Sequence, residues 1–314
     1  MVRVISRAYC SSANLGSGFD VVAIALDVYY DEVMVSINRG NGNVVLEGIE
    51  GPFADLVSRD LNTAVAAVRE VLKYVNRSDV DVYVRLWKGI PPSAGLGGSG
   101  ASAVAAIKSL ITALDLNLTN DEIIELAGRA EAVVAGEAHY DNVSASLLGG
   151  LVIIISQNPI KVVRLNINAY FVVSTPVIRM PPNKTAIMRS ILPKFVSLHD
   201  MVRNYGKLAA LISGLITGNL ALAGYGMEDY IIEPARSSYI PCYEVVKREA
   251  ISNGALGVAI SGAGPTLITL CENLESAKRI SEVIKSTYTK CGYEVLIKVA
   301  QVGPGAEVID VSYD

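Results

Sequence analysis

Segments with two different spacings of hydrophobic residues occur in mixed order along this chain. Apolar residues at every second position predict strands, and apolar residues three or four positions apart predict helices. The alternating segments are residues 28–37, 80–87, 151–156, 161–167, 170–175, 256–261, 266–272 and 293–299. The helical segments are residues 61–75, 101–114, 121–138, 195–216, 236–252 and 274–289. The pattern predicts an α+β protein.

The length of the chain and a break in the pattern predict two domains. A chain of 314 residues is long enough for two hydrophobic cores. The turn at residues 157–159 separates two halves with a similar mixture of strands and helices. We therefore expect domains spanning residues 1–157 and 158–314.

The composition indicates a globular protein and argues against several partners. Hydrophobic residues make up 51% of the chain and charged residues 18%, with a net charge of -4 and no block of like charges. This balance argues against nucleic acid or a membrane as the main partner. No apolar run has the length of a bilayer span, and the first residues lack the apolar core of a secretory signal. A soluble, cytoplasmic protein is expected.

The cysteines and histidines give no sign of a zinc site, of a histidine-built metal site or of a disulfide framework. The four cysteines form no C-x-x-C pair and are far apart in the sequence: Cys10, Cys242, Cys271 and Cys291. This spacing gives no sign of a zinc site or of a set of disulfides. With His139 and His199 as the only histidines, a metal site built from histidine is not expected.

A glycine-rich stretch, Pro91–Ala103, follows a predicted strand and precedes a predicted helix. Gly95, Gly97 and Gly100 have the G-x-G-x-x-G spacing of a dinucleotide-binding turn. That fold needs an acidic residue at the end of the next strand, whereas a helical pattern follows here. A loop that binds phosphate with backbone N–H groups at a helix start explains the stretch better. The alternative is a turn that only lets the helix pack closely on its sheet.

Three segments together resemble the signatures of the GHMP small-molecule kinases. Residues 91–101 resemble P-x-x-x-G-L-G-S-S-A-A, residues 260–266 (ISGAGPT) resemble the C-terminal signature, and residues 11–20 (SSANLGSGFD) resemble the N-terminal one. The resemblance implies an N-terminal, ATP-binding domain with a left-handed βαβ unit and a ferredoxin-like C-terminal domain. It also implies a homodimer.

Further segments resemble the homoserine kinases within that family. They are residues 136–143 (GEAHYDNV) with Gly149 and Gly150, residues 189–193 (RSILP) and residues 233–236 (EPAR). The resemblance implies ATP-dependent phosphorylation of the hydroxyl of L-homoserine to O-phospho-L-homoserine, a step of threonine biosynthesis.

The same resemblance implies residues for ATP and Mg²⁺. Asn62 and Lys88 are expected near the adenine, and Trp87 is a further candidate whose alternative role is packing. The phosphates are expected over Pro91, Pro92, Ser93, Ala94, Gly95, Leu96, Gly97, Gly98, Ser99, Gly100, Ala101 and Ser102. Mg²⁺ is expected between Ser99 and Glu131. Glu125 and Glu137 share the predicted helix with Glu131, so the choice among the three rests on the resemblance.

Homoserine carries a carboxylate, an ammonium and a hydroxyl, and the matched segments supply side chains for each. Arg189 and Arg236 suit bidentate binding of the carboxylate. Asp20 suits the ammonium and Asn14 the polar end of the substrate, although both residue types also cap turns. His139 either contacts the substrate or fixes a loop. Gly262 and Gly264 complete the predicted substrate site.

The residues leave two mechanisms and two rival functions open. We expect Asn142 to orient the hydroxyl, because phosphoryl transfer depends mainly on positioning and charge neutralisation. Asp141 is then structural, and the alternative is that it acts as a base. The rival functions are a GHMP kinase for a sugar, mevalonate or shikimate, and a non-catalytic member of the fold.

Overall fold

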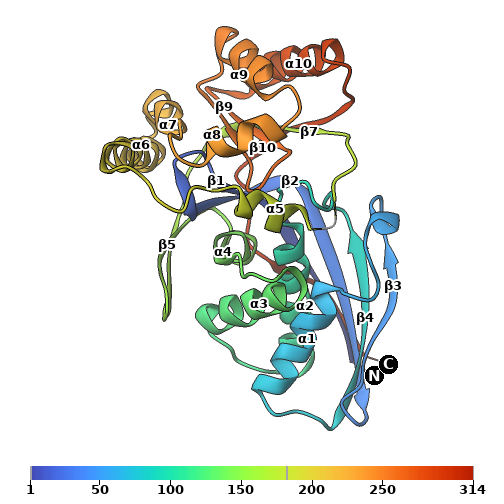
Figure 1. Ribbon diagram of the computed structural model, residues 1–314. Helices are drawn as coiled ribbons and strands as arrows, with labels where there is room; N and C mark the ends of the chain where they lie inside the picture. The colour runs from blue at the N-terminus through green and yellow to red at the C-terminus, as the bar shows by residue number, and fades with distance from the viewer. Residues whose placement is uncertain (1, 182, 314) are drawn as a thin grey trace.

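The computed structural model describes residues 2–181 and 183–313, which form two β-sheets with helices packed on them (Figure 1). The first sheet has seven strands: β1 (Val2–Asn14), β2 (Gly18–Arg39), β3 (Val44–Glu50), β4 (Val80–Lys88), β5 (Leu151–Gln157), β6 (Ile160–Leu165) and β11 (Glu307–Tyr313). The helices of this half are η1 (Ala54–Leu56), α1 (Thr63–Tyr74), α2 (Gly98–Ala113), α3 (Asn120–Ala135) and α4 (Tyr140–Leu148).

The first sheet is mostly antiparallel and contains one parallel pair. Its main path runs β11-β1-β2-β4-β3, and β5 pairs with β2 and with β6. Strand β1 alternates as far as Cys10, with Val4, Ala8 and Cys10 buried, as expected for a strand with one face on a core, and its last residues, to Asn14, are all buried. Strands β3 and β4 are parallel and α1 connects them, so these elements form a βαβ unit. The left hand of this unit stays a prediction.

Helix α2 occupies the centre of the N-terminal half. It packs on β1 and β2 and contacts α1, α3 and α4. Most of its residues are buried, and small side chains such as Ala101, Ala105 and Ala106 let neighbouring elements approach closely. Helix α1 begins at the cap Asn62, and α3 begins with a capping box formed by Thr119 and Glu122.

The second sheet has the strand order of a ferredoxin-like domain. Its strands are β7 (Tyr170–Pro176), β8 (Gly257–Ile260), β9 (Leu267–Cys271) and β10 (Val295–Gln301), and their spatial order is β10-β7-β9-β8. The helices of this half are α5 (Lys184–Ser190), α6 (Leu198–Thr217), α7 (Leu220–Gly226), α8 (Glu233–Arg236), η2 (Ser237–Tyr239), α9 (Tyr243–Ser252) and α10 (Leu274–Lys290).

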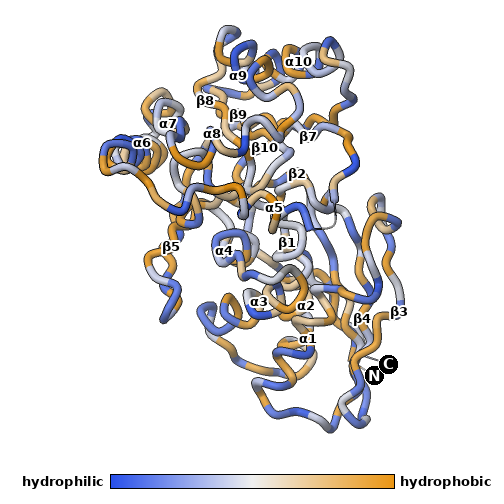
Figure 2. The backbone as a smooth tube through the Cα atoms, in the orientation of Figure 1, coloured by the Kyte–Doolittle hydropathy of each residue, from blue (hydrophilic) through white to orange (hydrophobic). Residues whose placement is uncertain are grey.

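Each face of the second sheet packs against a different hydrophobic core. Val172 of β7 packs in a cluster with α9 and α10, whereas Phe171 and Val173 pack in the large core shared with the N-terminal half and with α6 and α7. In Figure 2 the colour of α9 and α10 changes repeatedly between hydrophobic and hydrophilic, as expected for helices with one face on a sheet. Because neighbouring side chains of β7 point to opposite faces of the sheet, this strand contributes to both cores and packs against both halves of the chain.

Several predicted elements need correction. The helix predicted for residues 121–138 ends at Ala135, because Gly136 adopts a left-handed conformation with a φ of 85°. A separate helix, α4, follows it. The helix predicted for residues 236–252 is broken at Pro241, and α9 begins at Tyr243. The sequence pattern missed β1, β3, β11, α5 and α7, and it missed the first ten residues of β2.

The strand pairing places segments from beyond residue 157 in the first sheet. Strand β6, which follows residue 157, pairs with β5, and the C-terminal strand β11 pairs with β1. Both ends of the described chain therefore lie together on the first sheet (Figure 1). The division at residue 157 stays a proposal, and these pairings favour a boundary between β6 and β7.

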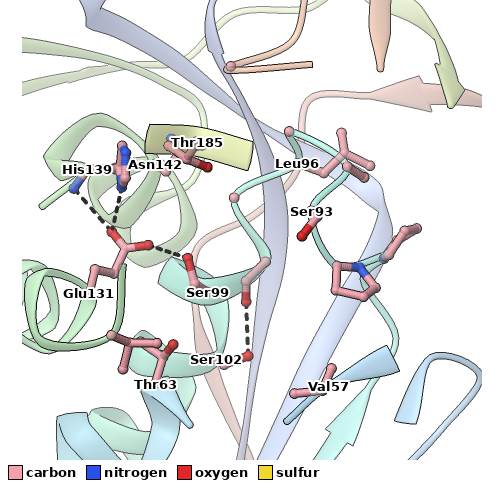
Figure 3. Close-up of a pocket in the computed structure, with 18 of the residues that line it drawn as sticks. Val57, Thr63, Ser93, Leu96, Ser99, Ser102, Glu131, His139, Asn142 and Thr185 are labelled. Carbon is pink, nitrogen blue, oxygen red and sulfur yellow. Dashed lines mark hydrogen bonds and ion pairs between the residues drawn. The ribbon is translucent and has the colours of Figure 1, made fainter. Parts of the chain in front are cut away.

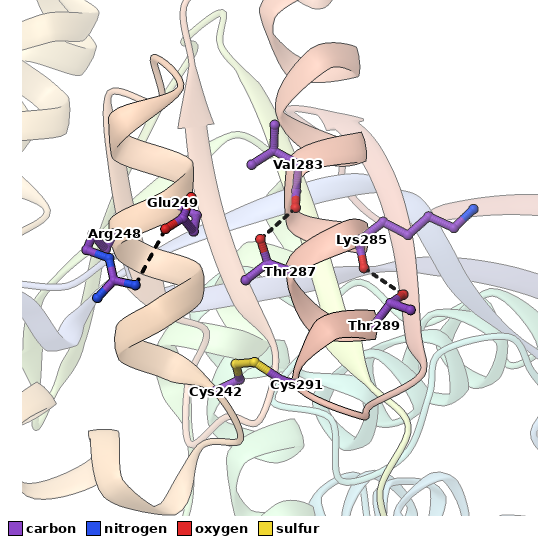
Figure 4. The surroundings of a disulfide bond; sticks show 8 residues. All are labelled: Cys242, Arg248, Glu249, Val283, Lys285, Thr287, Thr289 and Cys291. Carbon is purple, nitrogen blue, oxygen red and sulfur yellow. Dashed lines mark hydrogen bonds and ion pairs between the residues drawn. A yellow bond between two sulfur atoms is a disulfide. The ribbon is translucent and has the colours of Figure 1, made fainter.

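The expectation of no disulfide is wrong. Cys242 and Cys291 form a disulfide between the start of α9 and the end of α10, with Cα atoms 6.4 Å apart (Figure 4). A sequence separation of 49 gives no local spacing from which the pair could be predicted. Cys10 and Cys271 are free and buried. None of the helices in residues 2–181 and 183–313 is long and apolar enough to cross a bilayer.

Candidate active site

The glycine-rich loop precedes α2 and has a left-handed backbone conformation at two positions, which favours glycine. Gly95 and Gly97 have φ values of 83° and 63°. A Cβ atom on Gly95 would lie 2.3 Å from the carbonyl oxygen of Ser261 and 2.7 Å from that of Gly264. The loop is therefore pressed against the second glycine-rich turn, Gly262–Gly264, and close packing accounts for part of the glycine pattern. The two signature segments form one structure.

A buried ion pair supports the loop from below. Lys88 Nζ lies 2.5 Å from Asp31 Oδ2 and donates to the carbonyl of Gly98 at 3.0 Å. Asp31 also accepts hydrogen bonds from the backbone N–H groups of Gly89 and Ile90, and from Ser102 Oγ. The ammonium of Lys88 thus holds the loop in place, and its contact with ATP stays a prediction. Asp31 lies outside every motif, so the sequence did not reveal this role.

A cavity of about 290 Å³ lies over the loop. Asn62 lines it while its side chain caps α1 by accepting from the N–H of Ala64 at 3.0 Å. Of the residues predicted for ATP, those lining the cavity are Asn62, Lys88, Pro91, Pro92, Ser93, Ala94, Gly95, Leu96, Gly97, Gly98, Ser99 and Ser102. Gly100 and Ala101 belong to the buried face of α2. The structure therefore brings most of the predicted phosphate loop to one cavity.

Ser99 and Glu131 meet at the wall of this cavity (Figure 3). Ser99 Oγ donates to Glu131 Oε1 at 2.5 Å, and the backbone N–H of His139 donates to Glu131 Oε2 at 3.2 Å. Burial raises the pKa of Glu131 to about 7, with the hydrogen bonds from Ser99 and His139 acting in the opposite direction. A hard cation would favour the ionised carboxylate, so this pair fits the predicted Mg²⁺ site.

The fit to Mg²⁺ depends on the oxygen ligands available. Among residues 2–181 and 183–313 there is no cluster of three or more Asp, Glu, His or Cys side chains that could hold a metal. One carboxylate and one hydroxyl are nevertheless the share that Mg²⁺ commonly takes from protein when phosphate oxygens and water supply the rest. Ser99 and Glu131 provide that share.

Two of the residues predicted for the substrate, Asp20 and Arg189, bind each other. Arg189 Nη1 lies 2.7 Å from Asp20 Oδ2, and its second nitrogen donates to Asp20 Oδ1 at 3.2 Å. Arg189 also pairs with Glu137 at 2.5 Å. The sequence-based assignment gave Asp20 and Arg189 to opposite ends of the substrate, whereas the structure joins them in a bidentate pair. An incoming amino acid would have to compete with this pair.

Arg236 is the more deeply buried guanidinium. It is 4% exposed, and it donates to the carbonyls of Met188 at 3.1 Å and Gly262 at 3.0 Å. Burial, with the nearby charge of Arg189, lowers the pKa of Arg236 to about 10. The ring of Phe19 lies 5.3 Å from both guanidinium carbons, so it holds the two cations near one another. Sequence reasoning did not single out Phe19.

Asn14 both caps its own turn and joins the two halves. Its Oδ1 accepts from the N–H of Asp20 at 3.1 Å, and its Nδ2 donates to the carbonyl of Gly262 at 3.1 Å. The turn that follows needs glycine, since a Cβ on Gly16 would lie 1.8 Å from the carbonyl oxygen of Met227. The turn-capping alternative is thus present for Asn14, and contact with substrate stays a prediction.

Asp141 and Asn142 lie in the first turn of α4. Asn142 lines the cavity, and its Oδ1 accepts from Ser11 Oγ at 2.9 Å. Asp141 Oδ1 accepts from the N–H of Asn142 at 2.8 Å. Burial, followed by the charge of Asp20, raises the pKa of Asp141 to about 7. The carboxyl group fixes the asparagine, and the asparagine faces the cavity.

The comparisons with known proteins agree with this arrangement. Residues 62–150 match the model of the GHMP kinase N-terminal domain, and residues 208–290 match that of the C-terminal domain. The homoserine kinase of Aeropyrum pernix is 41% identical over 310 residues, which cover 98% of each chain. The chain belongs to the homoserine kinases of the GHMP kinase family. The homoserine kinase of Thermoplasma acidophilum is 38% identical, over 98% of this chain and 97% of that one.

Solved structures of the GHMP kinases have the same fold. The homoserine kinase of Cytophaga hutchinsonii superposes with a TM-score of 0.91 at 31% identity, over 98% of this chain and 97% of that one. The mevalonate kinase of L. major has a TM-score of 0.70 at 20% identity, over 95% of each chain. This second likeness shows the fold alone. The two-domain GHMP kinase fold expected from the sequence is confirmed.

Proposed function

We propose that this homoserine kinase homologue transfers the terminal phosphoryl group of ATP to the hydroxyl of L-homoserine. One observation carries the proposal. Gly262 lines both the 290 Å³ cavity over the glycine loop and a small cavity that contains Asn14 and Arg236. A cavity suited to phosphates therefore adjoins a smaller one whose lining contains the guanidinium of Arg236 and the carboxylates of Asp229 and Glu233, a mixture of charges suited to an amino acid.

The two cavities that meet at Gly262 bind different parts of the reactants. Backbone N–H groups at the start of α2 hold the phosphates, while Lys88 and Asp31 keep the loop rigid. Ser99 and Glu131 hold Mg²⁺. When bound, Mg²⁺ neutralises charge on the phosphate oxygens. Arg236, with Arg189, binds the carboxylate of the substrate, and Asp20, which pairs with Arg189 in the ligand-free site, receives its ammonium.

Asn142 orients the hydroxyl toward the phosphate. Its side chain lies on the cavity wall, held by Ser11 and Asp141. A loose transition state needs little help from a base, because proton removal is late. Asp141 acts through Asn142 in this proposal. His139 contacts the substrate or the loop from the same wall.

The partners and compartment are proposals of the same kind. We expect a homodimer in the cytoplasm, with ATP and L-homoserine as its small-molecule partners and the product entering threonine biosynthesis. A net charge of -4 without blocks of like charge argues against nucleic acid or a membrane as a partner.

A coupled ADP-release assay tests the substrate. Homoserine, mevalonate, shikimate and galactose should be compared at equal concentrations. The proposal predicts a kcat/KM for homoserine at least about 100-fold above the others, because only homoserine carries both the carboxylate and the ammonium that the site matches. ADP release with mevalonate or shikimate but none with homoserine would assign the chain to another kinase. ATP binding without release from any alcohol would favour a non-catalytic member.

A further inference from the structure

Lys184 is a buried ammonium that the proposed mechanism does not use. It is the first residue of α5, it is 3% exposed, and its Nζ donates to the carbonyl of Gly264. The other buried lysines, Lys88 and Lys207, each pair with a carboxylate, Asp31 or Glu228. No such ion pair is found for Lys184 within the described part of the chain. A buried cation without a counter-ion is costly, so its retention points to an anion that binds there.

The electrostatics around Lys184 also favour an anion. Burial, together with the positive charge of Arg236, lowers the pKa of Lys184 to about 7. The pKa of His139 is lowered as well, mainly by burial, and the charge of Lys184 contributes to that lowering. Two positive groups, Lys184 and Arg236, thus lie close enough to repel each other, and an anion bound here would stabilise both.

The position of Lys184 indicates which anion that is. Lys184 lines the 290 Å³ cavity together with the loop Gly95–Ser99 and with Asn142. The carbonyl to which it donates, that of Gly264, lies 2.7 Å from the position of a Cβ on Gly95. The ammonium is therefore next to the phosphate loop, on the side where Gly262 borders the amino acid site. That end of the cavity suits the terminal phosphate of a nucleoside triphosphate.

We propose that the ammonium of Lys184 binds the terminal phosphate of ATP and neutralises charge on the phosphoryl group during its transfer. The inference rests on the proposed kinase function. In the transfer, the bond from phosphorus to the bridging oxygen of ADP breaks while a bond to the substrate oxygen forms. The hydroxyl proton passes to an oxygen of the transferred phosphoryl group, and Lys184 keeps its own proton. Cations placed this way act mainly on the transition state.

The test compares two nucleotides that differ in the terminal phosphate. Lys184→Gln removes the charge and keeps a donor for the Gly264 carbonyl, and Lys184→Arg keeps the charge. Calorimetry with Mg²⁺ should show that Lys184→Gln weakens the non-hydrolysable analogue AMP-PNP at least about tenfold and changes ADP affinity less than about twofold. Its kcat should fall about 100-fold, as for other groups that stabilise transferred charge. Lys184→Arg should retain most of the AMP-PNP affinity.

Controls separate this role from a structural one. Lys207→Gln removes a buried lysine of the same type outside the cavity, and it should leave both nucleotide affinities unchanged. Thermal melting shows whether each variant is folded. Equal loss of ADP and AMP-PNP affinity in a folded Lys184→Gln variant, or no loss of either, would overturn the role of Lys184. Failure of the unmodified protein to bind either nucleotide would instead contradict the proposed function.

Discussion

Arg236→Ala removes the buried guanidinium that the account assigns to the carboxylate of the substrate. A charge-assisted hydrogen bond contributes about 1.5–3 kcal/mol, and a bidentate contact contains two of them. Arg189 remains nearby and compensates part of the loss, so we expect a net cost near the lower end, about 3 kcal/mol. That cost corresponds to a fall of about 100-fold in kcat/KM for homoserine. Binding of ATP should be unchanged, because Arg236 lines the small cavity and not the larger one.

The assay measures ADP release, first with homoserine varied at saturating ATP and then with ATP varied at saturating homoserine. Arg248→Ala is the matched control, since Arg248 lies on α9 with a side chain that is 66% exposed. The free energy of unfolding should change less than the activity. The Arg236→Ala variant no longer has to bury a charged guanidinium, and the lowered pKa of Arg236 shows that this burial is costly. Equal losses in the KM values for ATP and homoserine, or no loss for homoserine, would refute the assignment.

Four further changes follow from the same geometry. Ser99→Ala should lower kcat about tenfold or more and raise the Mg²⁺ concentration needed for half-maximal rate; an unchanged Mg²⁺ titration would argue against a ligand role. Asp141→Asn should keep kcat within about tenfold in single-turnover assays, whereas a loss of 10³-fold or more with homoserine binding intact would show that a base is required. Glu131→Gln should stabilise the ligand-free protein increasingly as pH rises from about 4.5 to about 7, because a carboxyl whose pKa is raised on folding loses its contribution over that window; a difference in melting temperature that is independent of pH would contradict this. Cys242→Ser should lower the melting temperature, since closing a loop with a sequence separation of 49 accounts for at most about 4 kcal/mol of chain entropy; identical melting with and without reductant would show that the bond does not form.

Sequence patterns predicted those elements whose packing is regular. Helices α1, α2 and α10 and strands β4, β5 and β7 were predicted within a few residues. Helices α1 and α10 and strand β4 show the period of an element with one buried face, whereas α2 and β7 are buried nearly throughout and were recognised as apolar segments bounded by turns. Strand β3 was missed because, at the edge of the sheet, it is only partly buried along its length. The short helices α5 and α7 were missed since seven residues contain too little of a helical period.

Sequence motifs predicted residues of the candidate site, and tertiary contacts determine how those residues are arranged. The sequence predicted the glycine loop, Ser99, Glu131 and the two arginines as parts of one site. It could not predict that Asp20 and Arg189 form a pair, because their separation of 169 residues is closed only by the fold. Asp31 and Lys184 belong to no motif, so only their burial and their partners in the structure single them out. The disulfide was missed for the same reason.

A crystal structure with homoserine and AMP-PNP tests the central claim most directly. The account predicts the triphosphate over residues 95–99, with the substrate carboxylate on Arg236 and the hydroxyl between Asn142 and the terminal phosphate. Electron density for the nucleotide elsewhere with the glycine loop empty, or homoserine bound away from Arg236, would contradict it.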